Sequence, residues 1–160
     1  MDLHPDFRDL LVELVRCEVS FVLIGGYAVG HHAKPRATKD LDLLVSGVPD
    51  NLARTASALE AFGAPPNVVD AVRALGPTEV VYLGVAPVRV DILRSADGID
   101  TEQVIARADR VVLDGLEIPV IALADLIANK RASGRSQDLA DVELLDRVAR
   151  GRAGPGVTFR

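Results

Sequence analysis

The sequence predicts an α+β fold, in which a small mixed β-sheet is flanked by helices and followed by C-terminal helices. Apolar residues at helical spacing alternate with short β-branched segments along the chain. Two pairs of these segments are separated by turn residues and predict hairpins. The 160 residues contain no repeat and have a length typical of one domain. We therefore expect residues 1–150 to form a single domain and residues 151–160 to form a flexible tail.

The first half of the chain predicts four helices and two strands. Pro5 stands where a first helical turn tolerates proline, and apolar residues then recur at three- and four-residue steps. A β-branched and aromatic segment precedes the pair Gly25-Gly26, which favours a buried strand that ends at a glycine turn. The elements expected here are helix 5–18, strand 19–24, helix 27–33, strand 40–45, helix 49–62 and helix 67–75.

The second half predicts two hairpins, each followed by helices. Residues 84–87 form the turn of the first hairpin, and Asp114-Gly115, a dipeptide favoured in tight turns, forms the second. The two last helices are joined by a short polar segment. The elements expected here are strands 79–83 and 88–93, helix 101–108, strands 110–113 and 116–120, and helices 122–131 and 137–150.

Composition excludes several classes of protein. Apolar residues make up 49% of the chain and charged residues 26%, which is typical of a folded domain. A net charge of −5 argues against a protein that coats nucleic acid. The single cysteine, Cys17, excludes an internal disulfide and a thiolate zinc site. Without a signal peptide or an apolar segment that could span a bilayer, we expect a cytoplasmic protein with no membrane partner.

Two acidic motifs carry the candidate chemistry. Strand alternation places Asp40 and Asp42 on one face and Leu41 and Leu43 on the other. Like charges this close are unfavourable unless a cation lies between them, and oxygen ligands suit Mg²⁺ or Mn²⁺. Asp91 lies on another apolar strand and is a candidate third ligand. The alternatives are a solvated edge strand with two exposed acids for the first pair, and an ordinary polar face with Asp91 paired to Arg89 for the second motif.

A glycine pair and a histidine pair are the other candidate motifs in this region. Gly25-Gly26 would let the backbone approach a phosphate closely, although a tight turn explains the same pair. His31 and His32 follow at the end of a short predicted helix, where they could contact a base, although we expect them to cap the last turn or to be exposed.

Together these motifs resemble the core of the DNA polymerase beta superfamily of nucleotidyltransferases. The similarity is closer to small bacterial members, which include the toxins of AbiE-type toxin–antitoxin systems and standalone relatives. It extends over residues 19–146. The segments that carry it are Ile24-Gly25-Gly26, Arg36-Ala37-Thr38-Lys39, Asp40-Leu41-Asp42-Leu43, Val90-Asp91-Ile92 and Asp125 to Lys130 followed by Arg135 to Asp141.

The resemblance implies a role for each motif. Asp40 and Asp42 would hold the metals, and Asp91 would complete the second metal site and act as the base or orient it. Gly25-Gly26 would hold the triphosphate. In addition, Lys130 would reach a phosphate. Lys39 would either steer the nucleotide or balance the carboxylates.

The function implied is transfer of NMP from an NTP such as ATP to a hydroxyl acceptor, with release of pyrophosphate. The acceptor could be a tRNA, a small molecule or a protein. One alternative is a non-catalytic nucleotide- or partner-binding member of a toxin–antitoxin-like pair, with a cognate antitoxin as partner. A metal-dependent nuclease would need similar carboxylates, but the glycine pair fits triphosphate binding better.

Overall fold

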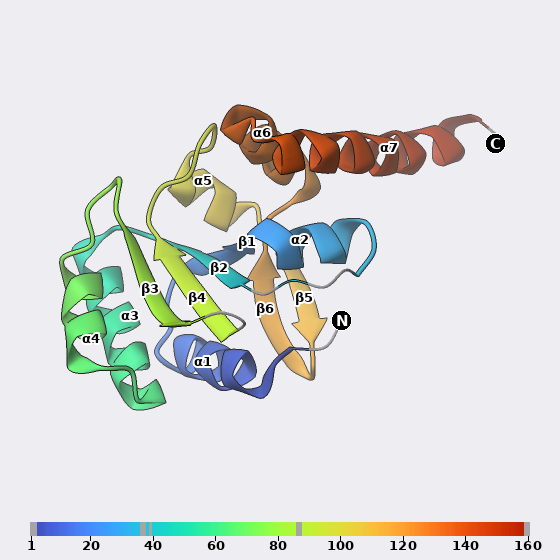
Figure 1. Cartoon of the computed structure of the whole chain (residues 1–160). Helices are drawn as coiled ribbons and strands as arrows, with labels where there is room; N and C mark the ends of the chain where they lie inside the picture. Colours follow the sequence, from blue (N-terminus) through green and yellow to red (C-terminus); the bar gives the residue numbers. More distant parts are fainter. Residues whose placement is uncertain (1–2, 36–37, 39, 86–87, 159–160) are drawn as a thin grey trace.

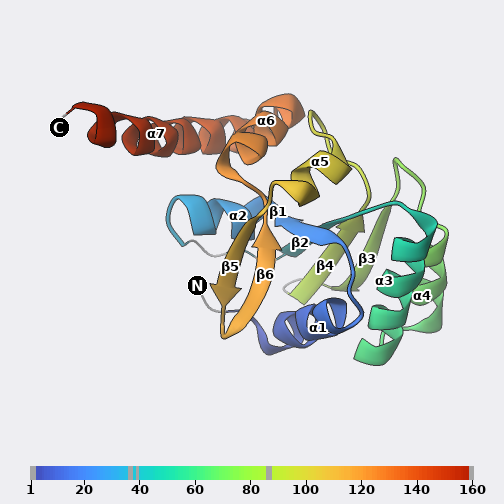
Figure 2. The ribbon, with the colours of Figure 1, turned by 180° about the vertical axis from the view of Figure 1, so that it is seen from behind.

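The computed structural model describes residues 3–35, 38, 40–85 and 88–158, and side chains as far as residue 152. A six-stranded sheet separates two groups of helices (Figures 1 and 2). Helices α1, α3 and α4 cover one face, and α2, α5, α6 and α7 lie on the other side. The helices are α1 (Pro5–Arg16), α2 (Gly25–His32), α3 (Pro49–Phe62), α4 (Pro66–Arg73), α5 (Thr101–Ala106), α6 (Leu123–Ser133) and α7 (Ser136–Thr158).

The sheet is mixed, as the sequence predicts. Its order is β3-β4-β2-β1-β6-β5. Strand β2 runs antiparallel to β1 and parallel to β4, so the two strands that carry the candidate acids are direct neighbours. The strands are β1 (Phe21–Ile24), β2 (Asp40–Val45), β3 (Val80–Val85), β4 (Val88–Leu93), β5 (Asp109–Leu113) and β6 (Leu116–Val120).

Both predicted hairpins are confirmed. Strand β3 pairs antiparallel with β4, and β5 pairs antiparallel with β6. At the second turn Asp114 and Gly115 both have positive φ, of 52° and 78°. Two positive φ values in a two-residue connection match the twist of the flanking strands, which explains the preference for this dipeptide.

The core lies between the sheet and the first group of helices. Leu10, Leu11 and Leu14 form the apolar face of α1 and are fully buried. Leu41 and Leu43 of β2 are buried as well, on the face opposite to the acids. The apolar residues on this face anchor β2, and the first half of its other face carries Asp40 and Asp42.

The buried amide of Asn51 ties β1, β2 and α3 together. Its Oδ1 accepts a hydrogen bond from the backbone N of Ser20 at 2.7 Å. Its Nδ2 donates to the carbonyls of Ser20 at 3.0 Å and Ser46 at 2.9 Å. One side chain thus satisfies polar backbone groups at the start of β1 and after the end of β2.

We expect Asn51→Ala to lower the free energy of unfolding by about 3 kcal/mol, because buried backbone groups then lose their partners. Urea unfolding measures the change. The control is Ser57→Ala, an exposed position in the same helix, which should change stability by less than about 0.5 kcal/mol. A loss at Asn51 no larger than that of the control would contradict the role given to the amide network.

Element boundaries differ from the prediction at a few places. Helix α2 begins at Gly25, two residues before the expected start, so the glycine pair forms its first turn. Helix α7 continues to Thr158 and includes most of the segment expected to be loose. The flexibility of residues 151–160 stays a prediction. Within the described parts of the chain, the helices are too short or too polar to cross a membrane.

Candidate active site

The candidate site is built on one row of residues that crosses four strands. In the register of the sheet Ile24 pairs with Asp42, Asp42 with Asp91, and Asp91 with Tyr82. Paired residues share a face and lie on strands about 4.8 Å apart. Asp40 pairs with Arg89 in the next row on the same face. The sheet therefore brings the three predicted acids together from two strands that are distant in sequence.

Gly25 and Gly26 lie at one end of this row, directly after Ile24. Gly25 has a φ of 71°, and a Cβ atom added to it would overlap the carboxylate of Asp42. A Cβ atom at Gly26 would lie 2.5 Å from Oγ1 of Thr38. Gly25 needs glycine because of its positive φ and its contact with Asp42, whereas at Gly26 the side chain of Thr38 leaves little room for a Cβ atom.

A pocket of about 520 Å³ opens beside the acids. The sheet forms the floor of the pocket, and α6 with the start of α7 forms the wall above it. It is lined by Ile24, Gly25, Gly26, Asp42, Asp91, Leu93, Ser95, Ala96, Asp97, Asn129, Lys130, Ser133, Arg135 and Asp138. The glycine pair, two of the acids and two cationic side chains thus face the same space.

The guanidinium of Arg89 bridges the two outer acids. Its Nε donates to Oδ1 of Asp91 at 2.8 Å, and its Nη2 donates to Oδ2 of Asp91 at 3.1 Å and to Oδ2 of Asp40 at 3.2 Å. The guanidinium carbon also lies 4.8 Å from the centre of the Tyr82 ring. A cation therefore already lies between two of the three carboxylates.

Asp42 is the most perturbed acid of the cluster. Burial raises its pKa most, and repulsion from Asp91 and Asp40 raises it further, from 3.8 to about 7. Lys130 and Arg89 oppose the rise without cancelling it. A carboxylate held in this way gains strongly from a bound cation. The donor set, three carboxylates without a thiolate or imidazole, suits a hard cation such as Mg²⁺ or Mn²⁺.

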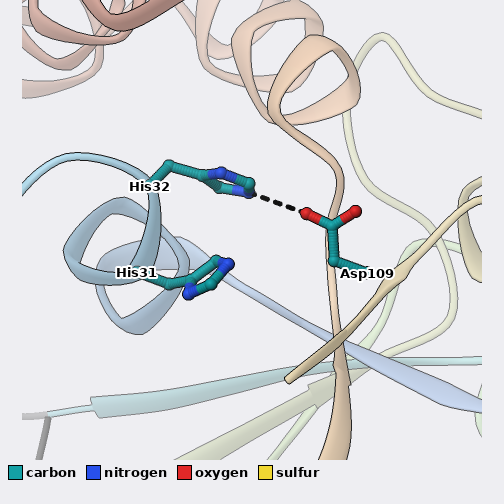
Figure 3. Close-up of side chains that lie close together, drawn as sticks. All are labelled: His31, His32 and Asp109. Atoms are coloured by element: carbon teal, nitrogen blue, oxygen red, sulfur yellow. Dashed lines mark ion pairs between the residues drawn. The ribbon is translucent and has the colours of Figure 1, made fainter. Parts of the chain in front are cut away.

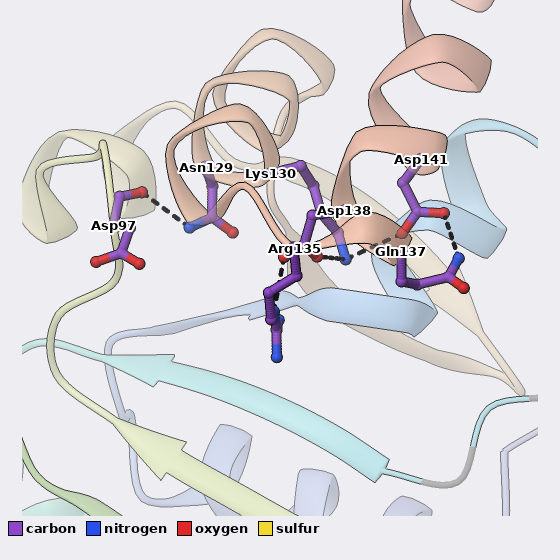
Figure 4. Close-up of polar contacts among 7 residues, drawn as sticks. All are labelled: Asp97, Asn129, Lys130, Arg135, Gln137, Asp138 and Asp141. Atoms are coloured by element: carbon purple, nitrogen blue, oxygen red, sulfur yellow. Dashed lines mark hydrogen bonds and ion pairs between the residues drawn. The ribbon is translucent and has the colours of Figure 1, made fainter.

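Lys130 lies in the pocket wall within a buried ionic network (Figure 4). Its Nζ is 3.2 Å from Oδ1 of Asp138 and 3.1 Å from Oδ2 of Asp141. Burial disfavours the charge on Asp138, but hydrogen bonds from Arg135 and Lys130 keep the pKa of this acid below its ordinary value. The network fixes the junction between α6 and α7 over the pocket.

Arg135 shares Asp138 with Lys130 but reaches solvent. Its Nε donates to Oδ2 of Asp138 at 2.7 Å, and 79% of its side chain is exposed. The guanidinium is therefore anchored at one point and open to the pocket. Asn129, which donates to the carbonyl of Asp97 at 2.9 Å, closes the same wall (Figure 4).

Six of the seven predicted site residues come together in this region. Five of them line the pocket: Asp42, Asp91, Gly25, Gly26 and Lys130. Asp40 does not line it but is joined to Asp91 by the guanidinium of Arg89. Lys39 lies outside the described residues. The pairing of Arg89 with Asp91, one of the alternatives for this strand, is present, but its bridge to Asp40 was not predicted. Arg135 was left out of the predicted site, although it opens the segment Arg135 to Asp141 that carries part of the family resemblance.

The histidine pair, drawn in Figure 3, does not line this pocket. The expectation that both histidines cap a turn or are exposed is wrong for His32, which is buried. Its Nε2 lies 2.6 Å from the carbonyl oxygen of Ile121. Because a carbonyl can only accept, this nitrogen carries the hydrogen. His32 therefore connects the end of α2 to the segment that leads into α6.

His31, His32 and Asp109 also have the spacing of a metal-binding group among the described residues. One ligand atom from each lies within 4.8 Å of the others. Nε2 of His32 lies 3.9 Å from Oδ2 of Asp109 (Figure 3). Binding a metal through this nitrogen would require His32 to release Ile121. In the present conformation the imidazole of His32 is therefore used for a structural hydrogen bond.

Comparisons with known proteins agree with this geometry. Residues 4–154 match the profile of a family described as "Nucleotidyl transferase of unknown function (DUF2204)". No curated protein matches the sequence significantly.

Several solved structures share the fold. The lincosamide antibiotic adenylyltransferase LnuA, in its lincomycin-bound form, superposes with a TM-score of 0.60 at 12% identity, covering 92% of this chain and 98% of that one. The antibiotic-resistance factor ANT(2'')-Ia gives 0.57 at 14% identity, with 92% and 88% covered. A Thermotoga maritima protein described as a nucleotidyltransferase gives 0.56 at 15% identity, with 92% and 90% covered. At these identities the likeness concerns the fold.

Proposed function

The chain belongs to this family of nucleotidyl transferases, and from that premise we propose that it transfers NMP from an NTP to a hydroxyl acceptor and releases pyrophosphate. One observation carries the proposal: the row that joins the glycine pair to Asp42 and Asp91 beside a pocket of about 520 Å³. A pocket of this size accommodates a small ligand such as a nucleotide.

The carboxylates Asp40, Asp42 and Asp91 would hold Mg²⁺ or Mn²⁺. The raised pKa of Asp42 and the guanidinium between Asp40 and Asp91 both indicate a site that favours cations. When bound, the metal would supply activation of the acceptor hydroxyl and stabilisation of the leaving pyrophosphate. We assign to Asp91 the further task of accepting the hydroxyl proton or orienting the group that accepts it.

The phosphates would lie against the start of α2. Backbone amides in the first turn of a helix are free to bind anions, and here that turn consists of Gly25 and Gly26, which both line the pocket. Arg135 supports the same assignment from the opposite wall, because its guanidinium is exposed to the pocket. Lys130 would act on the phosphates mainly by long-range electrostatic attraction, since its ammonium is already paired with two acids. Lys39 stays a candidate for steering the nucleotide.

A small molecule is the acceptor we favour over a tRNA or a protein. LnuA and ANT(2'')-Ia, which share the fold over nearly the whole chain, are described with lincomycin and with adenylyl-tobramycin. The net charge of −5 also disfavours a large contact with RNA. A non-catalytic role, with or without an antitoxin partner, is disfavoured because the three acids and the glycine pair are all in place.

Thermal unfolding with ATP and Mg²⁺, compared with Mg²⁺ alone, tests nucleotide binding. Ligand at about one hundred times its dissociation constant should add roughly 2.7 kcal/mol of stability. Transfer is then measured with ATP labelled at the α-phosphate and a mixture of small alcohols. Stabilisation by Mg²⁺ without any effect of ATP would favour the nuclease and contradict the proposal.

Replacing Arg89 tests the proposed metal site directly. We expect Arg89→Gln to tighten Mn²⁺ binding about tenfold, because the guanidinium no longer competes for Asp40 and Asp91. Isothermal titration with Mn²⁺ alone measures the change. Arg107→Gln is the matched control, since Arg107 is paired with Asp125 away from the acids. Weaker Mn²⁺ binding in Arg89→Gln would show that Arg89 supports the metal instead of competing with it.

A further inference from the structure

Tyr82 occupies the end of the acid row that is opposite to the glycine pair. It is paired with Asp91, so its ring lies on the face of the sheet that carries the acids. The residue is 54% exposed, although it is one of the large apolar side chains. It does not line the pocket beside the acids. This aromatic side chain therefore belongs to a separate surface that adjoins the site.

Nucleotidyl transfer requires that the acceptor and the leaving pyrophosphate lie on opposite sides of the reacting phosphorus. In an in-line displacement the attacking and leaving oxygens lie on opposite sides of the phosphorus atom. If the triphosphate lies at the Gly25-Gly26 end of the row, the leaving pyrophosphate lies there as well. The acceptor must then approach from the Asp91 end, where the next residue of the row is Tyr82.

We propose that Tyr82, with Arg89 beside it, forms the docking face for the acceptor, and that the acceptor is a small alcohol built on a sugar ring. This inference rests on the function proposed above and names the residue that would select the substrate. In the transfer, the acceptor oxygen forms a bond to the α-phosphorus, the bond from that phosphorus to the bridging oxygen breaks, pyrophosphate leaves, and Asp91 takes the hydroxyl proton.

The form of the surface supports this class of acceptor. Arg89 lies 4.8 Å from the ring centre and restrains the orientation of Tyr82. The partner of Arg89 on the edge strand is Gly84, which adds no side chain to the face. Val80, two residues before Tyr82 and on the same face, is also exposed. The result is an exposed, partly apolar surface next to a carboxylate.

A sugar ring satisfies both parts of this surface. Its C–H face is apolar and can stack on an exposed aromatic ring, and its hydroxyls project from the rim toward polar partners. A linear alcohol would reach Asp91 but would leave the ring of Tyr82 unused. Tyr82 would therefore distinguish ring-bearing acceptors from acyclic ones without changing the reaction itself.

Nuclear magnetic resonance of the protein labelled at tyrosine can observe docking directly. The chain has two tyrosines, and Tyr27 is buried against Phe7 with ring centres 6.0 Å apart, which makes it an internal control. With ATP and Mg²⁺ present, methyl glucoside and methyl ribofuranoside should shift the Tyr82 ring signals in a saturable way and leave those of Tyr27 unchanged. Glycerol, which lacks a ring, should shift neither.

Kinetics with the same three alcohols complete the test. Tyr82→Ala should raise KM for the accepted glycoside about three- to tenfold, the range expected for loss of one stacking contact. Its KM for ATP should not change, and Tyr82→Phe should restore binding. Val112→Ala, at an exposed position on the opposite edge strand, is the control.

The outcomes separate this inference from the function on which it rests. A protein that does not bind ATP with Mg²⁺ would overturn the proposed function. A protein that binds ATP but accepts no glycoside, or accepts one equally well after Tyr82→Ala, would overturn the docking role of Tyr82 and leave the function standing.

Discussion

Replacing Asp42 by asparagine is expected to lower kcat for nucleotidyl transfer at least about a thousandfold, because the site would lose one of the carboxylates that we propose hold the metal. Asparagine keeps the size and shape of the side chain, so packing around β2 should be preserved. The measurement is transfer of the labelled α-phosphate at saturating ATP and Mg²⁺. Asp91→Asn should produce a loss of the same order.

Two controls accompany this prediction. Asp50→Asn changes an exposed acid at the start of α3, far from the pocket, and should retain full activity. Thermal unfolding without metal should show that Asp42→Asn is folded. A folded Asp42→Asn protein with more than about a tenth of the normal rate could not be reconciled with metal catalysis at this site.

The second large effect concerns stability in the absence of metal. The pKa of Asp42 is about 7 in the folded protein and 3.8 without its surroundings, so between these values the folded state binds more protons than the unfolded state. The free energy of unfolding should therefore fall as pH rises from about 4 to 7, by on the order of 4 kcal/mol from this one group. Above pH 7 this loss is complete.

Urea unfolding in the presence of EDTA, followed from pH 5 to 8, measures this dependence. Asp42→Asn cannot ionise, so it should lose less stability than the wild type over this range, by roughly 2–3 kcal/mol. At pH 8 without metal, Asp42→Asn should be the more stable of the two proteins. Excess Mg²⁺ should make the wild type the more stable one, because the metal stabilises the ionised carboxylate. Parallel pH profiles for the two proteins would show that Asp42 is not under electrostatic strain.

Much of the fold could be predicted because local pattern determines it. The bounds of β2 and β4 agree with the predicted segments because charged and apolar residues alternate within both segments, as expected for a half-buried strand. The Asp114-Gly115 turn follows from backbone conformation alone. The three acids were found for the same reason, since each is a polar interruption of an apolar strand.

The features that sequence reasoning missed depend on contacts between distant segments. Arg89 meets Asp40 because β2 and β4 are parallel neighbours, a register that no local pattern encodes. His32 is buried because the chain returns 89 residues later, at Ile121, whose carbonyl accepts its hydrogen. Arg135 faces the pocket because α6 and α7 fold back over the sheet. Such long-range pairings follow from topology, which periodicity does not define.

The close approach of Gly25 to Asp42 means that these two positions cannot be redesigned independently. Any side chain at position 25 would occupy the volume that the Asp42 carboxylate fills, and the positive φ of Gly25 would be strained as well. A design that places a larger residue at position 25 and retains the acid would therefore have to rebuild the turn first.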